Sequence, residues 1–570
     1  MIRQYCFYRQ RKSKAASPPL HRRLSMLGLM ILWAAMTIMG TDVRAEEKDE
    51  NTAPAPSPSQ NEAGPQENKP ARPAFGLSDV EELAEKLASQ SYNAPQDNGA
   101  LKDIPEKVWK LIQFKDEHKL WRNQGLPFEA GFFHPGFIFN NMTPIEIIEG
   151  DRVEPFAFNA DYFIHPGREA LEAAKGGKLN YAGFSLYYPL NELDKMDEVL
   201  SFLGATHFRA LAKRSQYGLE ARGLIINPAK TEGEEFPYFR RFWLVKPAAD
   251  SVAFAVYALM DSPSLTGAYQ FEISPGPSTV MEVKAALFRR NGKDKPLKIG
   301  LAPMGSMYLF SEKENCGKSD WRPEIHNSDI FLWTEGDDNW FRRPLANPDR
   351  LEISCFDLNE PKGFGLMQQD NNFDHYQDFS TRFDLKPSLW VEPAGDWGPG
   401  QLELMEIPAN QEIHNNIIAF WSPAEAPLTD KKRFDFAYKM YWMPSGTVPH
   451  QLGRAVSTRA SRDPETGVQN FIIDFEGGPL NDIPSNNGLA SVVSVLPELP
   501  VLEKNLVKNP VTGGWRLTFK LKTNENGGLV QSLLSARGER KSLRVKALLK
   551  RGENLPEALT ETWVYDIPIR

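Results

Sequence analysis

The chain has 570 residues, of which 41% are hydrophobic, 25% charged and 11% aromatic, and this is the composition of an ordinary folded protein with room for two or more cores. Residues 1–45 hold eight Lys or Arg and one Asp, so the remainder has 58 basic and 73 acidic residues and a net charge of −15. That charge argues against nucleic acid or an anionic membrane surface as partner, because both require clustered positive charge.

Residues 1–45 have the pattern of an export signal. A basic stretch ends at Arg22-Arg23, the apolar run LSMLGLMILWAAMTIMG follows, and Val43-Arg44-Ala45 suits signal peptidase. The two arginines leave a twin-arginine signal open beside an ordinary one. The apolar run is short for a membrane anchor, so we expect no stable membrane insertion, with an uncleaved anchor as the alternative. The predicted location is the bacterial periplasm.

Residues 46–74 are rich in Pro, Glu, Ala and Asn and are predicted to be a disordered linker. Order begins at 75. The stretch FGLSDVEELAEKLA predicts a helix with a capping box from Ser78 to Glu81, and the patterns at 104–114 and 191–204 predict two more.

From about residue 205 the sequence consists of short β-branched or aromatic runs divided by Gly, Pro, Asn or Asp, which predicts strands. A polar, proline-containing break at 422–433 separates this region from about seven further strand patterns. The fold class is therefore mostly all-β. We predict a large β-sandwich over 75–421, a linker at 422–433 and an immunoglobulin-like sandwich over 434–570.

Cofactor and metal chemistry have little support in the sequence. There is no GxxxxGK[ST], strand-GxGxxG-helix, HExxH or CxxC pattern, and the nine histidines are scattered. We predict no cofactor and no metal site. After the signal only Cys316 and Cys355 remain, and export permits a disulfide between them without establishing one.

Aromatic density marks one region as a candidate carbohydrate site. Six of the thirteen tryptophans lie between 321 and 421, among loops rich in Asp, Asn, Arg and Glu. Flat aromatic faces suit sugar rings, while polar side chains satisfy hydroxyls, although core packing is the alternative for each tryptophan. The residues predicted to bind substrate are Trp321, Arg322, Trp333, Trp390, Trp397, His326 and His414.

Cleavage of a glycosidic bond would need two carboxyl groups, one protonated and one ionised. The region offers several acids, none of which the sequence singles out: Asp329, Asp374, Asp378, Asp384, Glu392 and Glu412. Histidines beside such acids could relay protons, although a hydrogen-bonded structural histidine is the commoner outcome.

A dense and collinear set of motifs runs from about residue 75 to the C-terminus, and it includes FEAGFFHPGFIFN, EARGLIINPA, WRPEIHNSD, GFGLMQ, DLKPSLWVEP and GDWGPGQLELMEIP. With these motifs the chain resembles the periplasmic glucan biosynthesis proteins G and D, the D type more closely. The resemblance implies a galactose-mutarotase-like β-sandwich followed by an immunoglobulin-like domain. It also implies a role in making osmoregulated periplasmic glucans with β-1,2-linked glucose backbones.

Some members of that family are inverting β-1,2-glucanases with two essential aspartates. The resemblance places these in the motifs matching RPEIHNSD and QEIHNN, where this chain has Asn327 and Asn415. An amide neither donates a proton as a carboxylic acid does nor activates water as a carboxylate does. Asp329 and Glu412 lie within three residues of these positions and are the candidate substitutes.

Three hypotheses remain open at this point. The protein binds β-glucan without cleaving it, or neighbouring acids make it an active hydrolase or transglycosylase. In the third hypothesis it is a scaffold that recruits the inner-membrane glucan synthase. Glucan binding without turnover would support the first hypothesis, and release of oligosaccharides would support the second. Absence of glucan affinity in the purified protein would support the third.

Overall fold

The computed structural model describes residues 75–568 except 96–100, 102–103, 168–171, 173–178, 229–232, 293–295, 312–319, 338, 413–414, 425–427, 429–431, 485–487, 523–541 and 553–556. The predicted export signal and linker lie outside the described residues, as do Cys316 and His414, so the disulfide stays a prediction. No described helix is long and apolar enough to cross a bilayer.

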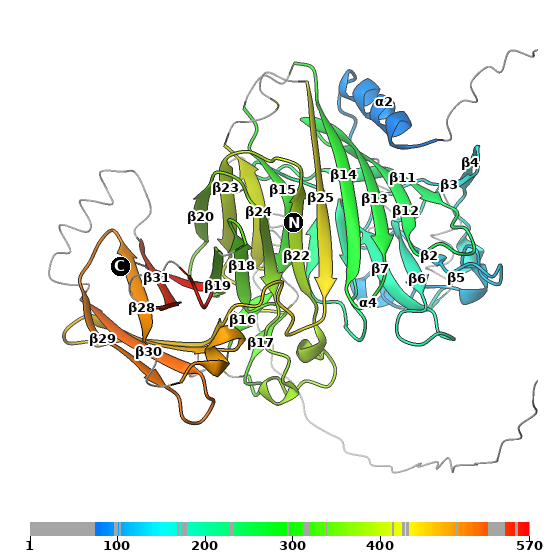
Figure 1. The fold of residues 1–570 in the computed structure, drawn as a ribbon. Coiled ribbons are helices and arrows are strands. Elements are labelled where there is room, and N and C mark those ends of the chain that lie inside the picture. The colour runs from blue at the N-terminus through cyan, green and yellow to red at the C-terminus, as the bar shows by residue number, and fades with distance from the viewer. Residues whose placement is uncertain are drawn as a thin grey trace, which may run out of the picture. The chain divides into compact units, whose positions relative to one another are not determined.

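The described chain is mostly β and forms several sheets, which confirms the predicted fold class (Figure 1). A large sandwich pairs two of them. Its first sheet contains, among the described residues, ten strands: β2 (Glu129–Phe133), β6 (Gly183–Tyr188), β7 (Asp197–Leu203), β8 (His207–Ala210), β9 (Glu220–Arg222), β10 (Ile225–Ile226), β15 (Ile299–Ser306), β20 (Glu352–Leu358), β23 (Gly400–Glu406) and β24 (Ile417–Pro423).

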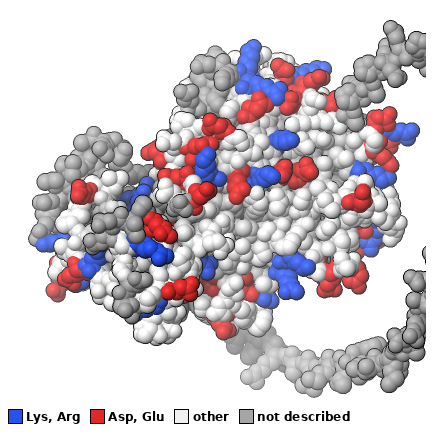
Figure 2. All heavy atoms as spheres, viewed as in Figure 1, with Lys and Arg blue, Asp and Glu red and all other residues white. Residues whose placement is uncertain are grey.

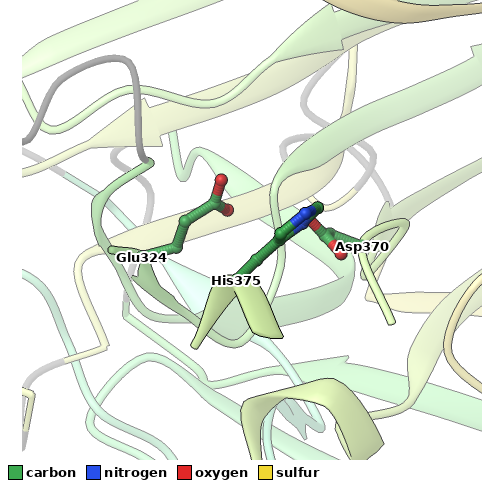
Figure 3. Close-up of side chains that lie close together, drawn as sticks. All are labelled: Glu324, Asp370 and His375. Atoms are coloured by element: carbon green, nitrogen blue, oxygen red, sulfur yellow. The ribbon is translucent and has the colours of Figure 1, made fainter. Parts of the chain in front are cut away.

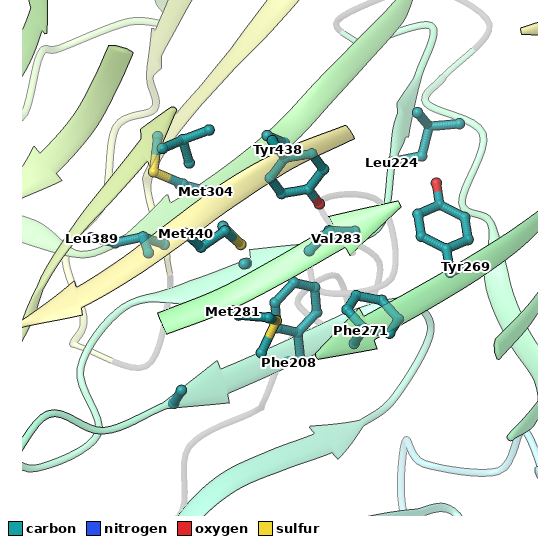
Figure 4. Packing of buried hydrophobic residues seen from close by; sticks show 14 of the residues in the cluster. Phe208, Leu224, Tyr269, Phe271, Met281, Val283, Met304, Leu389, Tyr438 and Met440 are labelled. Atoms are coloured by element: carbon teal, nitrogen blue, oxygen red, sulfur yellow. The ribbon is translucent and has the colours of Figure 1, made fainter. Parts of the chain in front are cut away.

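The facing layer is the greater part of a fourteen-stranded sheet in the described chain. Its strands in the large sandwich are β3 (Ile145–Glu149), β4 (Arg152–Phe156), β11 (Tyr238–Val245), β12 (Phe254–Asp261), β13 (Leu265–Ser274), β14 (Thr279–Arg289), β18 (Ile330–Thr334), β19 (Trp340–Pro344), β21 (Gly363–Met367), β22 (Ser388–Ala394) and β25 (Arg433–Met443). The core lies between the two sheets. Phe208 and Met304 from the first sheet meet Phe271, Met281 and Tyr438 from the second (Figure 4).

Strand periodicity produces this core. Along β14, Met281 and Val283 are buried and point into the sandwich, while Lys284 between Val283 and Ala285 is exposed. Successive side chains of a strand point to opposite faces, so every second residue reaches the core.

Helix α2 (Leu77–Ala88) confirms the first helix prediction and packs Val80 and Ala84 against Trp243 of the second sheet. Its cap differs from the predicted one, because the backbone N–H of Gly76 donates to the Asp79 carboxylate at 2.8 Å. Of the other two predicted helices, the first is much shorter than expected and the second is a strand. Residues 104–114 contain a single turn, α4 (Glu106–Trp109), and residues 191–204 contain strand β7.

Short elements complete the large sandwich. They are β1 (Gln113–Phe114) paired with β5 (Phe163–Ile164), β16 (Tyr308–Phe310) paired with β17 (Ile325–His326), and the 3-10 helices η2 (Asp116–His118), η3 (Ala160–Tyr162), η5 (Phe373–His375) and η6 (Phe383–Leu385).

A second, smaller sandwich follows, with its own core around Phe471, Phe519 and Trp563. Its described strands are β26 (Arg454–Arg462), β27 (Val468–Glu476), β28 (Leu489–Leu496), β29 (Val501–Lys508), β30 (Trp515–Lys522), β31 (Ser542–Arg551) and β32 (Thr562–Pro568), with η7 (Gly478–Asp482) between β27 and β28. Strands β28, β31 and β32 belong to the fourteen-stranded sheet, because β32 pairs in parallel with β19 of the large sandwich. The immunoglobulin-like arrangement stays a prediction.

The predicted boundary between the sandwiches needs correction. Strand β25 lies between β14 and β22, so residues 434–443 belong to the large sandwich. The reason is its alternation, which buries Phe436, Tyr438 and Met440 in the large core. In the break at 422–433, Pro423 ends β24 and Leu428 is buried in the same core. The two sandwiches are joined instead by residues 444–453, between β25 and β26.

Candidate functional site

Asn327 and Asn415 lie on two loops that are hydrogen-bonded to the start of β16 or to the residue before it. Strand β17 pairs with β16, and the Asn327 N–H, immediately after β17, donates to Met307 O at 2.8 Å. Asn416 is buried and fastens the second loop, because it accepts from Tyr308 N at 2.8 Å and donates to Tyr308 O at 2.9 Å. Asn327 itself and Asn416, the neighbour of Asn415, are therefore both hydrogen-bonded to residues 307–308, where β16 begins.

Both amides also contact one short segment, Gly218–Glu220, which leads into β9. The Asn327 Nδ2 donates to Gly218 O at 3.3 Å, and the Asn415 side chain hydrogen-bonds the Glu220 carboxylate. The structure therefore brings together two amides that are far apart in the sequence, on either side of Leu219. Both are half-buried and so accessible to a ligand.

Glu220 is itself buried and surrounded by positive or proton-bearing groups. Its carboxylate lies 3.2 Å from Arg209 Nη2, 3.4 Å from His207 Nε2 and 3.8 Å from Arg222 Nη2. Burial raises the pKa of Glu220, but His207, Arg209 and Arg222 outweigh it and lower that pKa to about 2. An ionised carboxylate only accepts hydrogen bonds, so Asn415 must donate its amide N–H to Glu220.

The amides are therefore oriented alike. Each donates an N–H to the protein, Asn327 to Gly218 O and Asn415 to Glu220. An amide oxygen is an acceptor only, so the carbonyl end of each amide can take a hydrogen bond from a donor. Lys386 covers Gly218 and donates to Tyr217 O at 2.8 Å, and burial together with Arg209 lowers the pKa of Lys386 to about 8.

His326 is fully buried, which corrects the prediction that it contacts substrate. Its Nε2 lies 2.7 Å from Glu324 Oε2 and its Nδ1 lies 3.0 Å from Gln368 Oε1. The Gln368 Nε2 donates to Phe383 O, which fixes the amide with Oε1 toward the ring. Both ring nitrogens therefore face acceptors. Burial lowers the pKa of His326, but Glu324 and Asp329 outweigh it and raise that pKa. His326 is thus held between Glu324 and Gln368 and fixes the end of β17 from which Asn327 follows.

The two substitute acids have different surroundings. Asp329 is half-buried and its Oδ1 accepts from Gln369 N at 2.9 Å. Burial raises the pKa of Asp329 above its ordinary range, against the lowering effects of His326 and Arg342. Glu412 is instead engaged in an ion pair with Arg322.

Arg322 joins three loops and has little capacity left for a ligand. It donates to both carboxylate oxygens of Asp320, to Asp378 Oδ2 at 2.8 Å and to Glu412. Four of the five guanidinium N–H groups are thereby used within the protein. The predicted substrate-binding role of Arg322 gives way to that of fastening the loops around the site.

The predicted tryptophans separate into buried and exposed groups. Trp333 and Trp390 are each 1% exposed and packed in hydrophobic clusters, so they cannot stack on a sugar, and this corrects the sequence interpretation. Trp397 is half-buried and donates to Ala437 O at 3.1 Å. Trp321 is 70% exposed and is the one predicted tryptophan that is open to a ligand in the described chain.

Glu324, Asp370 and His375 lie close together beside this region (Figure 3). One candidate ligand atom from each side chain lies within 4.8 Å of the others. The His375 Nδ1 contacts Asp370, and Glu324 contacts His326. These contacts account for the cluster as a hydrogen-bonded network, and it carries no metal assignment.

Sequence reasoning missed Glu220, Gly218, Lys386 and Gln368. Three of them lie in stretches that do carry a signal: YGLEARG places an acid in an apolar strand with an arginine two residues on, and GFGLMQ ends a buried strand on an amide. A buried polar residue in such a run requires a partner, although the run does not show which one.

The structure is that of a mostly β protein of two sandwiches, with Asn327 and Asn415 on polar loops of the larger one. The chain belongs to the family described as periplasmic glucan biosynthesis protein MdoG, whose model matches residues 75–567. It is 37% identical to glucans biosynthesis protein G of Pseudomonas aeruginosa and 36% identical to that of Dickeya dadantii, in each case over 87% of this chain and 93% of the relative.

These relatives carry the G name, and the expected closer likeness to the D type stays a prediction. A solved GH36 alpha-galactosidase from Geobacillus stearothermophilus matches 46% of this chain and 39% of its own, with 8% identity and a TM-score of 0.24. That similarity is too low to bear on the site.

Proposed function

We propose that this protein binds the β-1,2-glucan backbone in the periplasm during glucan biosynthesis and does not cleave it. Membership of the periplasmic glucan biosynthesis family supports a role in glucan biosynthesis and a location in the periplasm. The observation that carries the proposal is the orientation of Asn327 and Asn415, whose N–H groups are engaged by Gly218 O and Glu220. Their oxygens accept from hydroxyls, whereas general acid–base catalysis needs a group that exchanges protons.

Acidic and basic side chains are interspersed on the face of the molecule in Figure 2, without a patch of one sign. Such a surface suits a neutral polysaccharide better than a polyanion. The site itself mixes Arg209 and Lys386 with Glu220.

A second candidate is hydrolysis or transglycosylation with Asp329 as general acid. The raised pKa of Asp329 favours it, because a general acid must hold its proton near neutral pH. Inversion would require a second carboxylate roughly 6.5–9.5 Å away. Glu412, the other predicted substitute, is paired with Arg322.

The deciding experiment incubates the purified protein with linear β-1,2-glucan, measures affinity by calorimetry and resolves products by size. We expect binding without release of oligosaccharides, and weaker binding by Asn327→Ala and Asn415→Ala. The exposed Asn505→Ala in the small sandwich is the control amide. Release that stops in Asp329→Asn would establish the second candidate. Absence of any glucan affinity would support a scaffold for the synthase.

A further inference from the structure

The two most exposed aromatic side chains of the described residues are attached to a single ion pair. Trp321 is 70% exposed and Phe379 is 83% exposed. Trp321 directly precedes Arg322, and Phe379 directly follows Asp378. The Arg322 Nη1 lies 2.8 Å from Asp378 Oδ2. One ion pair therefore links the two loops, far apart in the sequence, that carry these exposed rings.

Both rings are held in place although they are exposed. The Arg322 guanidinium lies over the Trp321 ring at 5.9 Å, and the Phe379 ring packs against the half-buried Phe373 at 4.8 Å between centroids. Arg382 in turn lies over the Phe373 ring at 5.5 Å. Each exposed ring thus has a support that limits its rotation.

The loop that carries Phe379 is fixed in a conformation that L-residues rarely adopt. Gln377 and Arg382 have φ values of 57° and 48°, in the left-handed region. Asp378 holds the turn, because it accepts from Ser380 N at 2.9 Å and Thr381 N at 3.0 Å as well as from Arg322. Strained, pinned loops that expose large side chains are common at binding sites.

We propose that Trp321 and Phe379 form a stacking platform for glucose rings of the glucan chain, beyond the rings held at Asn327 and Asn415. The platform is linked to the loop of that site, because Arg322 also pairs with Glu412, which precedes Asn415 by three residues in the chain. The inference rests on the glucan-binding function proposed above and deepens it. It adds a second contact region, so that affinity depends on chain length.

A polysaccharide fits this surface better than a protein does. The residues that link the loops of the two rings are charged, because Arg322 pairs with both Asp320 and Asp378. Protein interfaces have a contiguous apolar centre from which charged residues are depleted. A sugar ring instead offers one apolar face for stacking and hydroxyls at its rim for neighbouring carboxylates and guanidinium groups.

The test compares Trp321→Ala and Phe379→Ala with the wild-type protein, using linear β-1,2-glucooligosaccharides of increasing length. Each truncation should weaken binding of long chains about three- to tenfold, with little effect on the shortest chains that bind. Trp321→Phe and Phe379→Tyr should retain most of the affinity, because they keep a stacking ring. Leu193→Ala, at a 95% exposed position, is the control.

A glucan-induced change in tryptophan fluorescence that is lost in Trp321→Phe would support contact at that ring. Long-chain affinity that is unchanged in both alanine variants would overturn the platform while leaving the amide site intact, provided that Asn415→Ala still weakens binding. A wild-type protein without any glucan affinity would overturn both the platform and the proposed function.

Discussion

The side-chain amide of Asn415 is hydrogen-bonded to the buried carboxylate of Glu220. This pairing predicts what an acid at position 415 would do. In Asn415→Asp the new carboxyl would face an ionised carboxylate, and like charges at this distance raise a pKa. The proton held there would suit a general acid.

We therefore expect the double variant Asn327→Asp, Asn415→Asp to release oligosaccharides from linear β-1,2-glucan, while each single variant releases far less. Adding Glu220→Gln should lower the pKa of the acid and shift the high-pH limb of the rate profile to lower pH. The measurement is product release across pH 4 to 9. A double variant with no release would show that the two positions lack the geometry for cleavage.

A second prediction concerns Arg322 as the fastening of the site loops. Arg322→Ala leaves Asp320, Asp378 and Glu412 without their shared partner, and its side chain is 11% exposed. We expect a loss of about 1–3 kcal/mol in stability, the usual effect of removing hydrogen bonds to charged groups. Hydrogen exchange should increase at residues 320–322 and 378–381. Arg551→Ala, from an exposed pair with Glu557, is the control and should change neither.

A third prediction concerns the contact between the two sandwiches. Arg343 of β19 donates to both oxygens of Glu406 at 2.9 and 2.7 Å and to Asp566 of β32 at 3.3 Å, and all three side chains are buried. Arg343→Met should destabilise the protein by about 3–5 kcal/mol in urea unfolding, because it leaves the buried Glu406 carboxylate without its cation, while Asp566 keeps its ion pair with Arg544.

The matched control for Arg343 is Arg433→Met, which removes ion pairs with Asp435 and Glu81 from an arginine that is 45% exposed. It should cost under about 1 kcal/mol. Equal losses in the two variants would contradict a special role for the buried network.

A fourth prediction concerns acid stability. Burial lowers the pKa of both His134 and His207 to about 4. Between the ordinary value of 6.5 and about 4, the unfolded chain binds protons that the folded chain does not. Stability is therefore fully present above pH 6.5 and falls as the pH decreases toward 4, by up to about 3 kcal/mol per histidine.

The measurement is urea unfolding at pH 7.5, 6 and 4.5. His134→Asn should reduce the loss of stability over this range, whatever its effect at pH 7.5. An unchanged pH dependence would show that His134 is protonated in the folded state.

The sequence predicted the β class and helix α2 because both depend on local periodicity, which the chain shows clearly. It failed at 191–204, where Val199, Leu200 and Phe202 fit both a helix and a strand, and where pairing of β7 with β6 and β8 decides the outcome. The boundary at 434 failed for a related reason. An alternating strand such as β25 fits either sandwich, and only its partners β14 and β22 assign it.

The geometry of the candidate site depends in the same way on contacts between distant residues. The motifs located Asn327 and Asn415, but sequence alone does not show that both amides contact Gly218–Glu220. Aromatic density favours Trp333 and Trp390 as sugar contacts, although each directly follows a leucine in a strand whose neighbouring residues are mostly apolar, a pattern that predicts burial. A tryptophan flanked by apolar residues is more informative about packing than about ligands.

The parallel pairing of β19 with β32 constrains the order in which this protein can fold. Strand β32 is synthesised after every other described strand, so β19 remains an open sheet edge until residues 562–568 are available. An unpaired edge is a template for aggregation, and long-range pairings form slowly. A chain truncated before Thr562 could still form the other strands of the large sandwich. Its strand β19 would then be an unpaired sheet edge that favours aggregation.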